Sequence, residues 1–355
     1  MLSKRFKYDK KPILILTDLQ SKYKKIVENK LKNKEYNLEK VKCIVCENEE
    51  FESLSEKDRY GLYAPVVICK ICGLVQSNPR MTQESYNRFY DLEYRKLYHG
   101  EVLPVQIYFK NQKLKGERIY KFIEKVIEEP IKNKFVVEIG TGAGGILEIF
   151  KERGNTVLGL DLGSKYIEFG KQHGLNLKVG TIEELSKLKR KPDIVIYSHV
   201  LEHILSPINE LKLLRKNLKP DSLVVIIVPG IKNLIKSYDQ DLLRYLQNAH
   251  TYHFSLTSLK NISRKAGFDI VYGDEEINSL LKPGKINNKY KNDYLQTKFF
   301  LKKLEKIRQN PFNLYKIKNK LFNLILLFLT KTKTKRLAKN FYDKFKYKNF
   351  NLNSR

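Results

Sequence analysis

Residues 134–161, KFVVEIGTGAGGILEIFKERGNTVLGLD, decide the fold. Residues 135–139 are a β-branched and aromatic run that ends in glycines, which predicts a buried strand followed by a tight turn. Apolar residues then recur at helical spacing over 146–150, and a second apolar run, 156–160, ends at Asp161. The stretch therefore predicts a β-α-β unit with a glycine-rich first turn.

Glycine suits this turn because it adopts backbone angles closed to other residues and lets a cofactor approach the main chain without meeting a Cβ. Gly140, Gly142 and Gly145 match the G-x-G-x-x-G dinucleotide fingerprint, although such a match alone is weak. Glu138 precedes the first glycine and extends the pattern to E-x-G-x-G-x-G through Gly144. A glycine turn that binds no cofactor is the alternative interpretation.

The pattern at residues 138–144 resembles motif I of the class I S-adenosylmethionine (SAM) dependent methyltransferases. The resemblance implies an α/β fold with a Rossmann-like, doubly wound sheet, in which the glycine turn holds the methionine part of SAM. It also implies that Asp161, at the end of the second strand, binds the ribose hydroxyls.

A second motif follows a predicted buried strand at residues 193–197. Its carboxyl end, at Ser198 and His199, is expected to face the cofactor crevice, because ligands of such sheets bind there. The run HVLEH at 199–203 is similar to the segment after the fourth strand of many small-molecule methyltransferases. In that family the turn after the third strand, here after residues 175–179, lies against the adenine. The predicted cofactor residues are Glu138, Gly140, Thr141, Gly142, Gly144, Asp161, Thr181, Ile182 and Ser198.

All four cysteines lie in two C-x-x-C pairs, Cys43 with Cys46 and Cys69 with Cys72. Four thiolates at this spacing predict a structural zinc site whose coordination is complete, and disulfides are the alternative. No cysteine remains to act as a nucleophile elsewhere, which excludes thiolate-based C5 methylation of pyrimidines. The acceptor motif Asn or Asp followed by Pro-Pro-Tyr is also absent, which argues against methylation of adenine N6.

The sequence CGLVQ at residues 72–76, followed by a tyrosine-rich helical stretch at 85–98, resembles the zinc-binding module of sugar C-methyltransferases and related glycan-pathway enzymes. In the sugar C-methyltransferases, Tyr-x-Glu-His precedes a Tyr-Phe-Ser pattern near the reacting carbon. Here His250 and the Phe254–Ser255 pair match, but Ala249 replaces the glutamate and Gln247 the first tyrosine. This departure favours a hydroxyl or amine acceptor over carbon.

Histidine suits removal of a hydroxyl proton because its pKa lies near neutral pH. Four of the six histidines are expected to flank the crevice, and packing or capping is the alternative role for each. His250 is the first candidate catalytic base and His199 the second, and His203 and His253 are further candidates.

The composition, with 355 residues and 42% hydrophobic side chains, predicts one large domain with appendages. The net charge of +29 suits a polyanionic partner, although codon bias explains it equally well. The predicted segments are a basic leader (1–40), a zinc-binding module (41–80), a helical connector (81–130), a SAM-binding Rossmann-like domain (131–275) and a basic helical C-terminal tail (276–355).

The tail contains an apolar run within residues 314–329 that is flanked by lysines and too short to span a bilayer. An interfacial helix on an anionic membrane and a helix packed on the core or on a second subunit are the two interpretations. No secretory signal is visible, which predicts a cytoplasmic protein with possible peripheral membrane contact.

These features predict a SAM-dependent methyltransferase with structural Zn²⁺ that acts on a hydroxyl or amine of a sugar, nucleotide-sugar or surface glycan. An RNA methyltransferase that docks its substrate on the zinc module is the main alternative. It is not favoured, because the sequence has no RNA-specific acceptor motif. A non-catalytic SAM-binding or membrane-associated assembly protein is the third hypothesis.

Overall fold

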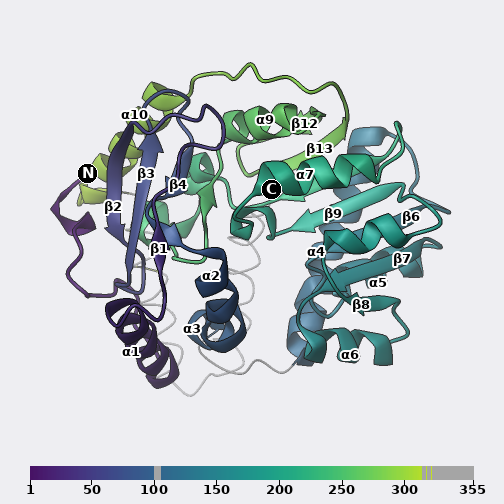
Figure 1. Cartoon of the computed structure of the whole chain (residues 1–355), viewed down its shortest axis with the longest axis horizontal. Helices are drawn as coiled ribbons and strands as arrows, with labels where there is room; N and C mark the ends of the chain where they lie inside the picture. Colours follow the sequence, from purple (N-terminus) through teal and green to yellow (C-terminus); the bar gives the residue numbers. More distant parts are fainter. Residues whose placement is uncertain (100–104, 314–316, 318–320, 322–355) are drawn as a thin grey trace.

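The computed structural model describes residues 1–99, 105–313, 317 and 321. Figure 1 shows two halves that lie side by side. One half contains a large sheet and its helices, and the other contains the smaller sheet of the cysteine module. Among the described residues no helix is long and apolar enough to cross a membrane.

The large sheet has seven strands in the order β12-β13-β10-β9-β6-β7-β8. The five strands from β10 to β8 are parallel, and β13 pairs antiparallel with both β10 and β12. The parallel strands place their carboxyl ends at one edge, where ligands of such sheets bind. The strands are β6 (Phe135–Ile139), β7 (Thr156–Asp161), β8 (Leu177–Val179), β9 (Ile194–Ser198), β10 (Leu223–Ile227), β12 (Phe268–Gly273) and β13 (Asn278–Pro283).

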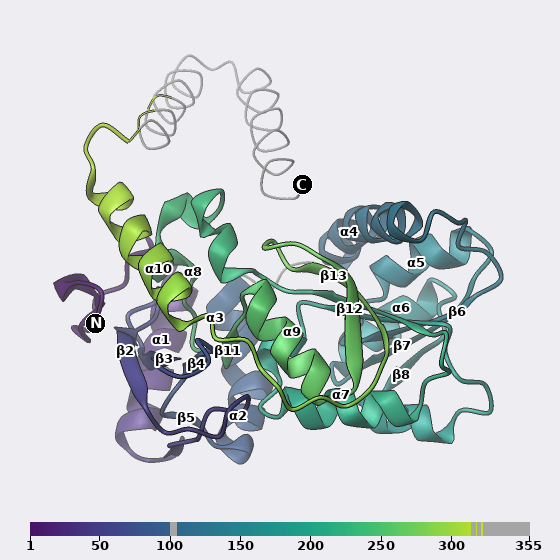
Figure 2. The same ribbon diagram turned by 90° about the horizontal axis from the view of Figure 1, so that it is seen from above.

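Helices cover both faces of this sheet (Figure 2). Successive residues of a strand point to opposite faces, so Val136 packs in the hydrophobic core beneath α4 and α5, and Val137 packs in the core on the α7 and α9 side. The helices are α4 (Val105–Ile127), α5 (Gly145–Glu152), α6 (Ser164–Gln172), α7 (Pro207–Lys216) and α9 (Leu256–Lys265), with 3-10 turns at Ile182–Lys187 and Leu201–His203. The predicted Rossmann-like α/β fold is confirmed.

The smaller sheet is antiparallel, in the order β11-β4-β3-β2. Its strands are β2 (Phe51–Lys57), β3 (Tyr63–Cys69), β4 (Val75–Ser77) and β11 (Tyr252–His253), and a separate pair joins β1 (Leu38–Glu39) to β5 (Arg80–Met81). Strand β11 comes from the chain between β10 and β12 of the large sheet, so the two halves are interlocked.

The tyrosine-rich stretch forms a helical run made of α2 (Gln83–Phe89), a π-helical segment (Tyr90–Tyr94) and α3 (Arg95–His99). Helix α1 (Asp18–Lys32) packs beside it through a hydrophobic cluster that includes Val27, Phe89 and Leu97. A π-helical segment often marks a functional position, because it redirects the side chains around it.

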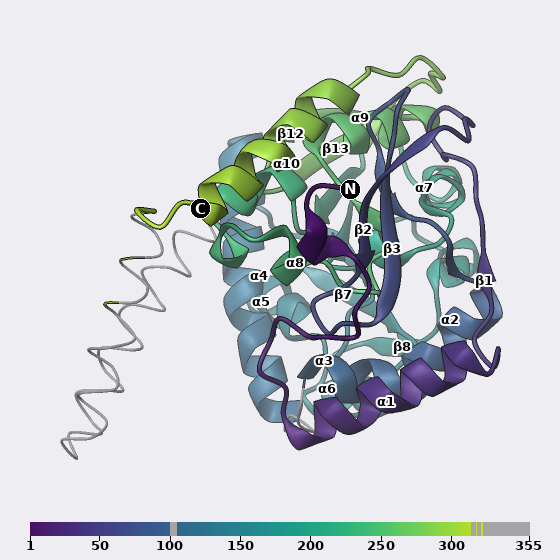
Figure 3. The same ribbon diagram turned by 90° about the vertical axis from the view of Figure 1, so that its left-hand side faces the viewer.

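The remaining elements are α8 (Leu242–Tyr245), α10 (Tyr294–Gln309) and 3-10 turns at Lys4–Phe6, Ile231–Ile235 and Tyr238–Gln240. The N-terminal segment lies against α8, α10 and β2 (Figure 3), where Phe6 is fully buried. The Arg5 guanidinium donates hydrogen bonds to Glu305 on α10 and to Asp241. Residues 1–40 therefore contribute to the core as well as carrying basic charge.

The sheet extends further than the sequence pattern predicts. The predicted SAM-binding domain ends at residue 275, yet β13 lies at 278–283 and forms the antiparallel partner of β10. Residues 278–283 form a strand of the sheet and not part of a helical tail. The predicted helix of the tail, within 314–329, lies largely outside the described residues.

Candidate functional site

The glycine turn joins β6 to α5 at the carboxyl edge of the large sheet. Gly140, Gly142 and Gly144 have φ angles of +69°, +56° and +82°, which side chains other than glycine rarely adopt. A Cβ on Gly140 would collide with Val200, and a Cβ on Gly142 would lie 2.6 Å from Tyr108 Oη. Glycine is thus required at both positions by the left-handed backbone and by the close packing of Val200 and Tyr108.

Two acidic side chains frame this turn. Asp161 accepts hydrogen bonds from the backbone N–H groups of Gly142 at 2.8 Å and Gly163 at 2.7 Å. Glu138 is buried and accepts a hydrogen bond of 2.7 Å from the Thr141 hydroxyl. Burial, with a smaller effect of Asp161, raises the pKa of Glu138 to about 8. Both acids thus lie at the turn, and their roles in SAM binding stay predictions.

Helix α4 packs against the glycine turn and forms hydrogen bonds with it. Gln112 donates from Nε2 to the carbonyl oxygen of Thr141 at 2.8 Å and accepts from the N–H of Gly145 at 3.3 Å. Tyr108, one helical turn earlier, lies over Gly142. The sequence predicts only a helical connector at 81–130 in this region, so neither residue was a predicted site residue, and their i, i+4 spacing is the one signal that could have paired them.

Arg95 of α3 is a further missed residue at the cofactor side. Its guanidinium carbon lies 3.8 Å from the centroid of the Tyr166 ring. A Cβ on Gly163 would lie 2.6 Å from Arg95 Nη2 and 2.9 Å from Asp161 Oδ1, so the guanidinium and the carboxylate flank the same point. The tyrosine-rich helix therefore reaches the carboxyl end of β7.

The other predicted cofactor residues occupy diverse environments. The Thr141 side chain is buried against Glu138, and Ile182 packs in the core. Thr181 is exposed at the end of β8, and Ser198 is half-buried at the end of β9. Their contacts to SAM stay predictions.

The four cysteines lie together at the edge of the small sheet. All four Sγ atoms lie within 4.8 Å of one another, with 3.3 Å between Cys43 and Cys72 and 3.4 Å between Cys46 and Cys69. All four thiols are free. Zn–S bonds of about 2.3 Å in a tetrahedron place sulfur atoms about 3.8 Å apart, so the cluster fits one zinc ion with no open position.

The two C-x-x-C pairs have the same backbone turn. The N–H of Glu47 donates to the carbonyl of Cys43 at 2.8 Å, and the N–H of Gly73 donates to that of Cys69 at 3.0 Å. Glu47 and Gly73 have φ angles of +60° and +81°. Repetition of this turn after both pairs indicates two zinc knuckles that face each other.

A second cluster lies after β9, where Glu202 is surrounded by three histidines. Its Oε1 atom lies 3.6 Å from His199 Nδ1, 3.7 Å from His203 Nε2 and 4.0 Å from His250 Nε2. The structure therefore brings together three of the four predicted histidines. His253 has no carboxylate within 4 Å among the described residues, and both of its ring nitrogens are buried without a hydrogen-bond partner there.

Burial lowers the pKa of His203 and, more strongly, that of His250, where His203 and His253 add to the effect. Burial lowers the pKa of His253 to about 3. These three imidazoles are therefore neutral at pH 7. His199 is the exposed member of the cluster, with 43% of its side chain accessible and a φ angle of +58° in the left-handed region.

The small sheet and the tyrosine-rich helix hold the segment that carries His250. Tyr86 Oη donates to the carbonyl oxygen of Ala249 at 2.5 Å, and the N–H of Ala249 donates to Tyr98 Oη at 3.1 Å. Tyr90 Oη lies 2.6 Å from His203 Nδ1. The histidine cluster therefore lies at the junction of the two halves, and Val200, which packs on Gly140, connects it to the glycine turn.

Comparison with known protein families gives one match, between residues 110–272 and a family model described as a methyltransferase domain. The chain is 27% identical over 132 residues to the ubiquinone biosynthesis O-methyltransferase of Coxiella burnetii, covering 36% of this chain and 52% of that protein. A protein of the same name from Roseobacter denitrificans is 31% identical over 103 residues, covering 27% and 42%. The chain thus spans about half the length of these relatives.

Among solved structures, a SAM-dependent methyltransferase from Archaeoglobus fulgidus has 27% identity and a TM-score of 0.38, covering 44% of this chain and 69% of that one. The plantazolicin methyltransferase has 17% identity and a TM-score of 0.39, covering 49% and 72%. With the fold and the glycine turn described above, the family match leads to one conclusion. Residues 110–272 match a methyltransferase domain, and with the Rossmann-like fold this supports a SAM-dependent methyltransferase.

Proposed function

We propose that this protein transfers the methyl group of SAM to a hydroxyl group of a small molecule. The observation that carries the proposal is the position of the histidine cluster, which follows β9 at the same sheet edge as the glycine turn. Val200 packs against Gly140, so the neighbouring His199 lies next to the place where the family binds its cofactor.

SAM, when bound, supplies a methyl group already activated by the sulfonium. The residues of the chain then align the acceptor and remove its proton, and alignment alone contributes on the order of 7 to 11 kcal/mol. The acceptor O–H bond breaks and its proton passes to a histidine, while an O–CH₃ bond forms and the S–CH₃ electron pair returns to sulfur. The products are a methyl ether, S-adenosylhomocysteine and one proton.

We assign the proton transfer to His199. Its side chain is 43% exposed, so an acceptor can reach it, and its Nδ1 lies 3.6 Å from Glu202 Oε1. His250, the first candidate from sequence, has only 4% of its side chain exposed, and its Nε2 contacts the Gln247 amide. Burial therefore argues for a different role for His250.

The type of acceptor rests on two similarities. The relatives from Coxiella burnetii and Roseobacter denitrificans are named O-methyltransferases, which supports oxygen as the acceptor atom. The CGLVQ sequence of the cysteine module resembles glycan-pathway enzymes, which supports a sugar or nucleotide-sugar hydroxyl. We therefore propose a sugar hydroxyl as the first acceptor to test and a phenolic hydroxyl as the second, in a cytoplasmic reaction.

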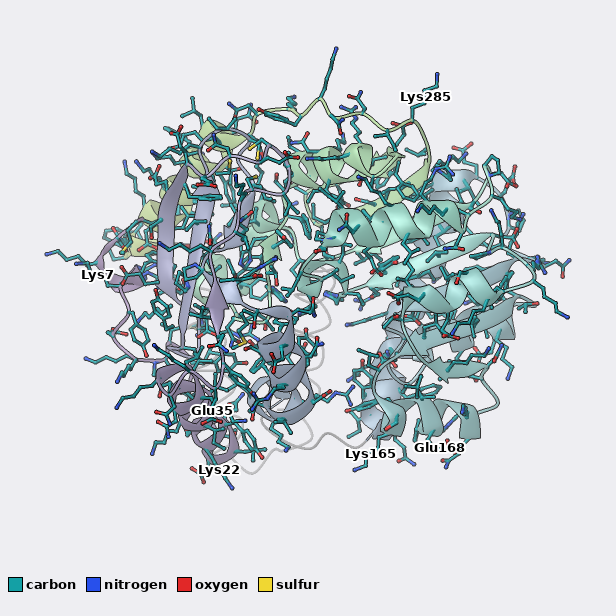
Figure 4. All side chains as sticks on the ribbon, viewed as in Figure 1. Lys7, Lys22, Glu35, Lys165, Glu168 and Lys285 are labelled. Carbon is teal, nitrogen blue, oxygen red and sulfur yellow. The ribbon has the colours of Figure 1, made fainter. Side chains whose placement is uncertain are left out.

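The RNA alternative has little specific support. The labelled lysines Lys7, Lys22, Lys165 and Lys285 project outward from separate regions of the chain (Figure 4). A nucleic-acid interface is expected to gather its basic side chains on one face, and these four lysines lie apart.

The test is transfer of labelled methyl from SAM to panels of nucleotide-sugars, free sugars and phenols, and to fractions of the host lysate with and without ribonuclease. We expect label in a ribonuclease-resistant small-molecule fraction. His199→Gln should lower kcat by about 10² to 10⁴-fold at unchanged SAM affinity. His173→Gln, at an exposed histidine of the α6 region, is the matched control. Label lost with ribonuclease would overturn the proposal.

A further inference from the structure

The carboxylate of Glu202 is buried without a hydrogen bond from the described residues to offset its loss of hydration. The residue is 1% exposed, and neither of its oxygens has a hydrogen-bond partner among the described residues. A buried carboxylate is stable only when hydrogen bonds, a cation or a proton offset the loss of hydration. The fold therefore leaves the charge of Glu202 to be balanced by something else.

Nitrogens of three histidine rings lie within 4.0 Å of Glu202 Oε1. The other contacts of His203 and His250 determine which of their ring nitrogens carries the proton. His203 Nδ1 lies 2.9 Å from the carbonyl oxygen of Ala249. A carbonyl oxygen only accepts, so Nδ1 carries the proton, which it shares with Tyr90 Oη at 2.6 Å as a second acceptor. The lone pair of His203 is then on Nε2, 3.7 Å from Glu202 Oε1.

The tautomer of His250 follows from a neighbouring contact. Arg59 Nη2 donates to Gln247 Oε1 at 2.8 Å, which turns the amide nitrogen of Gln247 toward His250 Nε2. His250 Nε2 therefore accepts the Gln247 amide hydrogen, and it lies 4.0 Å from Glu202 Oε1. The lone pair of His203 and the Glu202 carboxylate thus converge with no hydrogen between them, and His250 Nε2 joins them when it exchanges the Gln247 hydrogen bond for a metal bond.

This donor set is the kind that binds a divalent metal. One ligand atom from each of Glu202, His203 and His250 lies within 4.8 Å of the others. Bonds of about 2.0–2.2 Å from oxygen and nitrogen to a metal require separations of about 3–3.6 Å, which small side-chain movements supply here. The bond from His203 Nδ1 to a backbone carbonyl is the outer contact that usually orients a metal-binding histidine.

We propose that Glu202, His203 and His250 bind one divalent cation, separate from the metal of the four cysteines. Two imidazoles and one carboxylate leave coordination positions open, and these positions suit an oxygen donor of the acceptor. This last role rests on the proposed function, whereas cation binding does not.

The test is titration of the purified full chain, with its cysteine-site zinc retained, with Mn²⁺ followed by electron paramagnetic resonance. Mn²⁺ prefers oxygen and nitrogen ligands, so it leaves the thiolate site unchanged. We expect one Mn²⁺ per wild-type chain. Glu202→Gln and, independently, His203→Gln should each weaken its binding at least tenfold, and His173→Gln should not.

Zinc content and SAM affinity are measured on each variant to establish that it is folded. Absence of Mn²⁺ binding to the wild type, with and without SAM, would overturn the proposal, and so would binding that both variants retain. Such a result would leave Glu202 and the histidines as a proton-transfer cluster. Mn²⁺ binding without methylation of any hydroxyl acceptor would refute the proposed function and leave the metal site standing.

Discussion

The hydroxyl of Ser77 donates a hydrogen bond of 2.9 Å to the carbonyl oxygen of His250. Ser77 ends strand β4, which begins three residues after Cys72, and its backbone N–H also donates to the carbonyl of Thr251 at 2.9 Å. The cysteine module therefore positions the segment that carries His250, although that segment belongs by sequence to the methyltransferase half.

Replacing a cysteine should disturb both halves. We expect Cys72→Ser to lower the zinc content and to reduce the free energy of unfolding by roughly 4 kcal/mol or more, since loss of a structural metal is among the largest single-residue effects. Methyl transfer should fall more than SAM affinity, because the glycine turn lies in the other half. Metal analysis, urea unfolding and calorimetry measure these quantities.

The control for this variant is Lys70→Ala, which lies in the same knuckle with an exposed side chain. It should retain zinc and stability. Equal loss of SAM affinity and methyl transfer in Cys72→Ser would contradict the positioning role of the module.

Alanine variants of Gly142 and Gly154 distinguish the effect of backbone strain from that of side-chain crowding at the cofactor turn. Gly142 and Gly154 both have positive φ, but a Cβ on Gly142 would meet Tyr108 and Gln112, whereas one on Gly154 would meet nothing within 4 Å. Both alanine variants should lose roughly 1–2 kcal/mol of stability from the left-handed backbone. Only Gly142→Ala should also lose SAM binding, measured by calorimetry. Unaltered binding would argue that the turn does not contact the cofactor.

Asp161 is predicted to bind the ribose of SAM. Asp161→Asn should weaken SAM binding by about 10 to 100-fold, which corresponds to the roughly 1.5–3 kcal/mol of hydrogen bonds to a charged group. Asp221→Asn, at an exposed turn before β10, is the control and should bind SAM normally. If the two variants bound SAM equally well, the assignment of Asp161 would be wrong.

Glu305 gives a pH-dependent prediction. Burial opposes ionisation, but hydrogen bonds from Arg308 and Arg5 outweigh it and lower the pKa of Glu305 to about 2. Its ordinary pKa is 4.5, so its stabilising effect is complete above that pH and disappears as the pH falls toward 2.

We expect Glu305→Gln to cost about 1–2 kcal/mol at pH 7, a value reduced for partial solvent screening, and to cost progressively less below pH 4.5. Urea unfolding at pH 7, 5 and 3 measures this difference. Glu47→Gln removes an exposed ion pair with Lys265 and should change little. A difference that stays constant with pH would show that the loss of Glu305 acts through packing alone.

The large sheet was predictable because its signals are local. The glycines at 140–144, the acid at 161 and the HVLEH run each lie beside a buried strand, and the apolar pattern of each strand is visible in the sequence. The C-x-x-C pairs were equally clear, since metal ligation depends on short spacings. Strand β13 was missed because Asn278–Pro283 contains polar residues and a terminal proline, and becomes a strand only by pairing with β10.

Contacts between the halves were not predictable. Nothing local indicates that Tyr90 lies against His203, or that Ser77 binds the carbonyl of His250. Both depend on how the tyrosine-rich helix and the small sheet pack against the methyltransferase domain. The sequence therefore suggested which histidines matter but not that Glu202 lies between them.

Strand β11 lies in the small sheet although the chain on both sides of it belongs to the large sheet. This placement limits which fragments of the protein can fold. A fragment limited to residues 110–272 would contain Tyr252 and His253 without β4, their pairing partner, and would lack the tyrosine hydroxyls that hold Ala249. It would also lack β13, leaving β10 and β12 with open edges, which favour aggregation. Residues 110–272, the region that matches the methyltransferase domain model, are thus not expected to fold as an independent domain. Expression of the catalytic half requires the cysteine module on the same polypeptide.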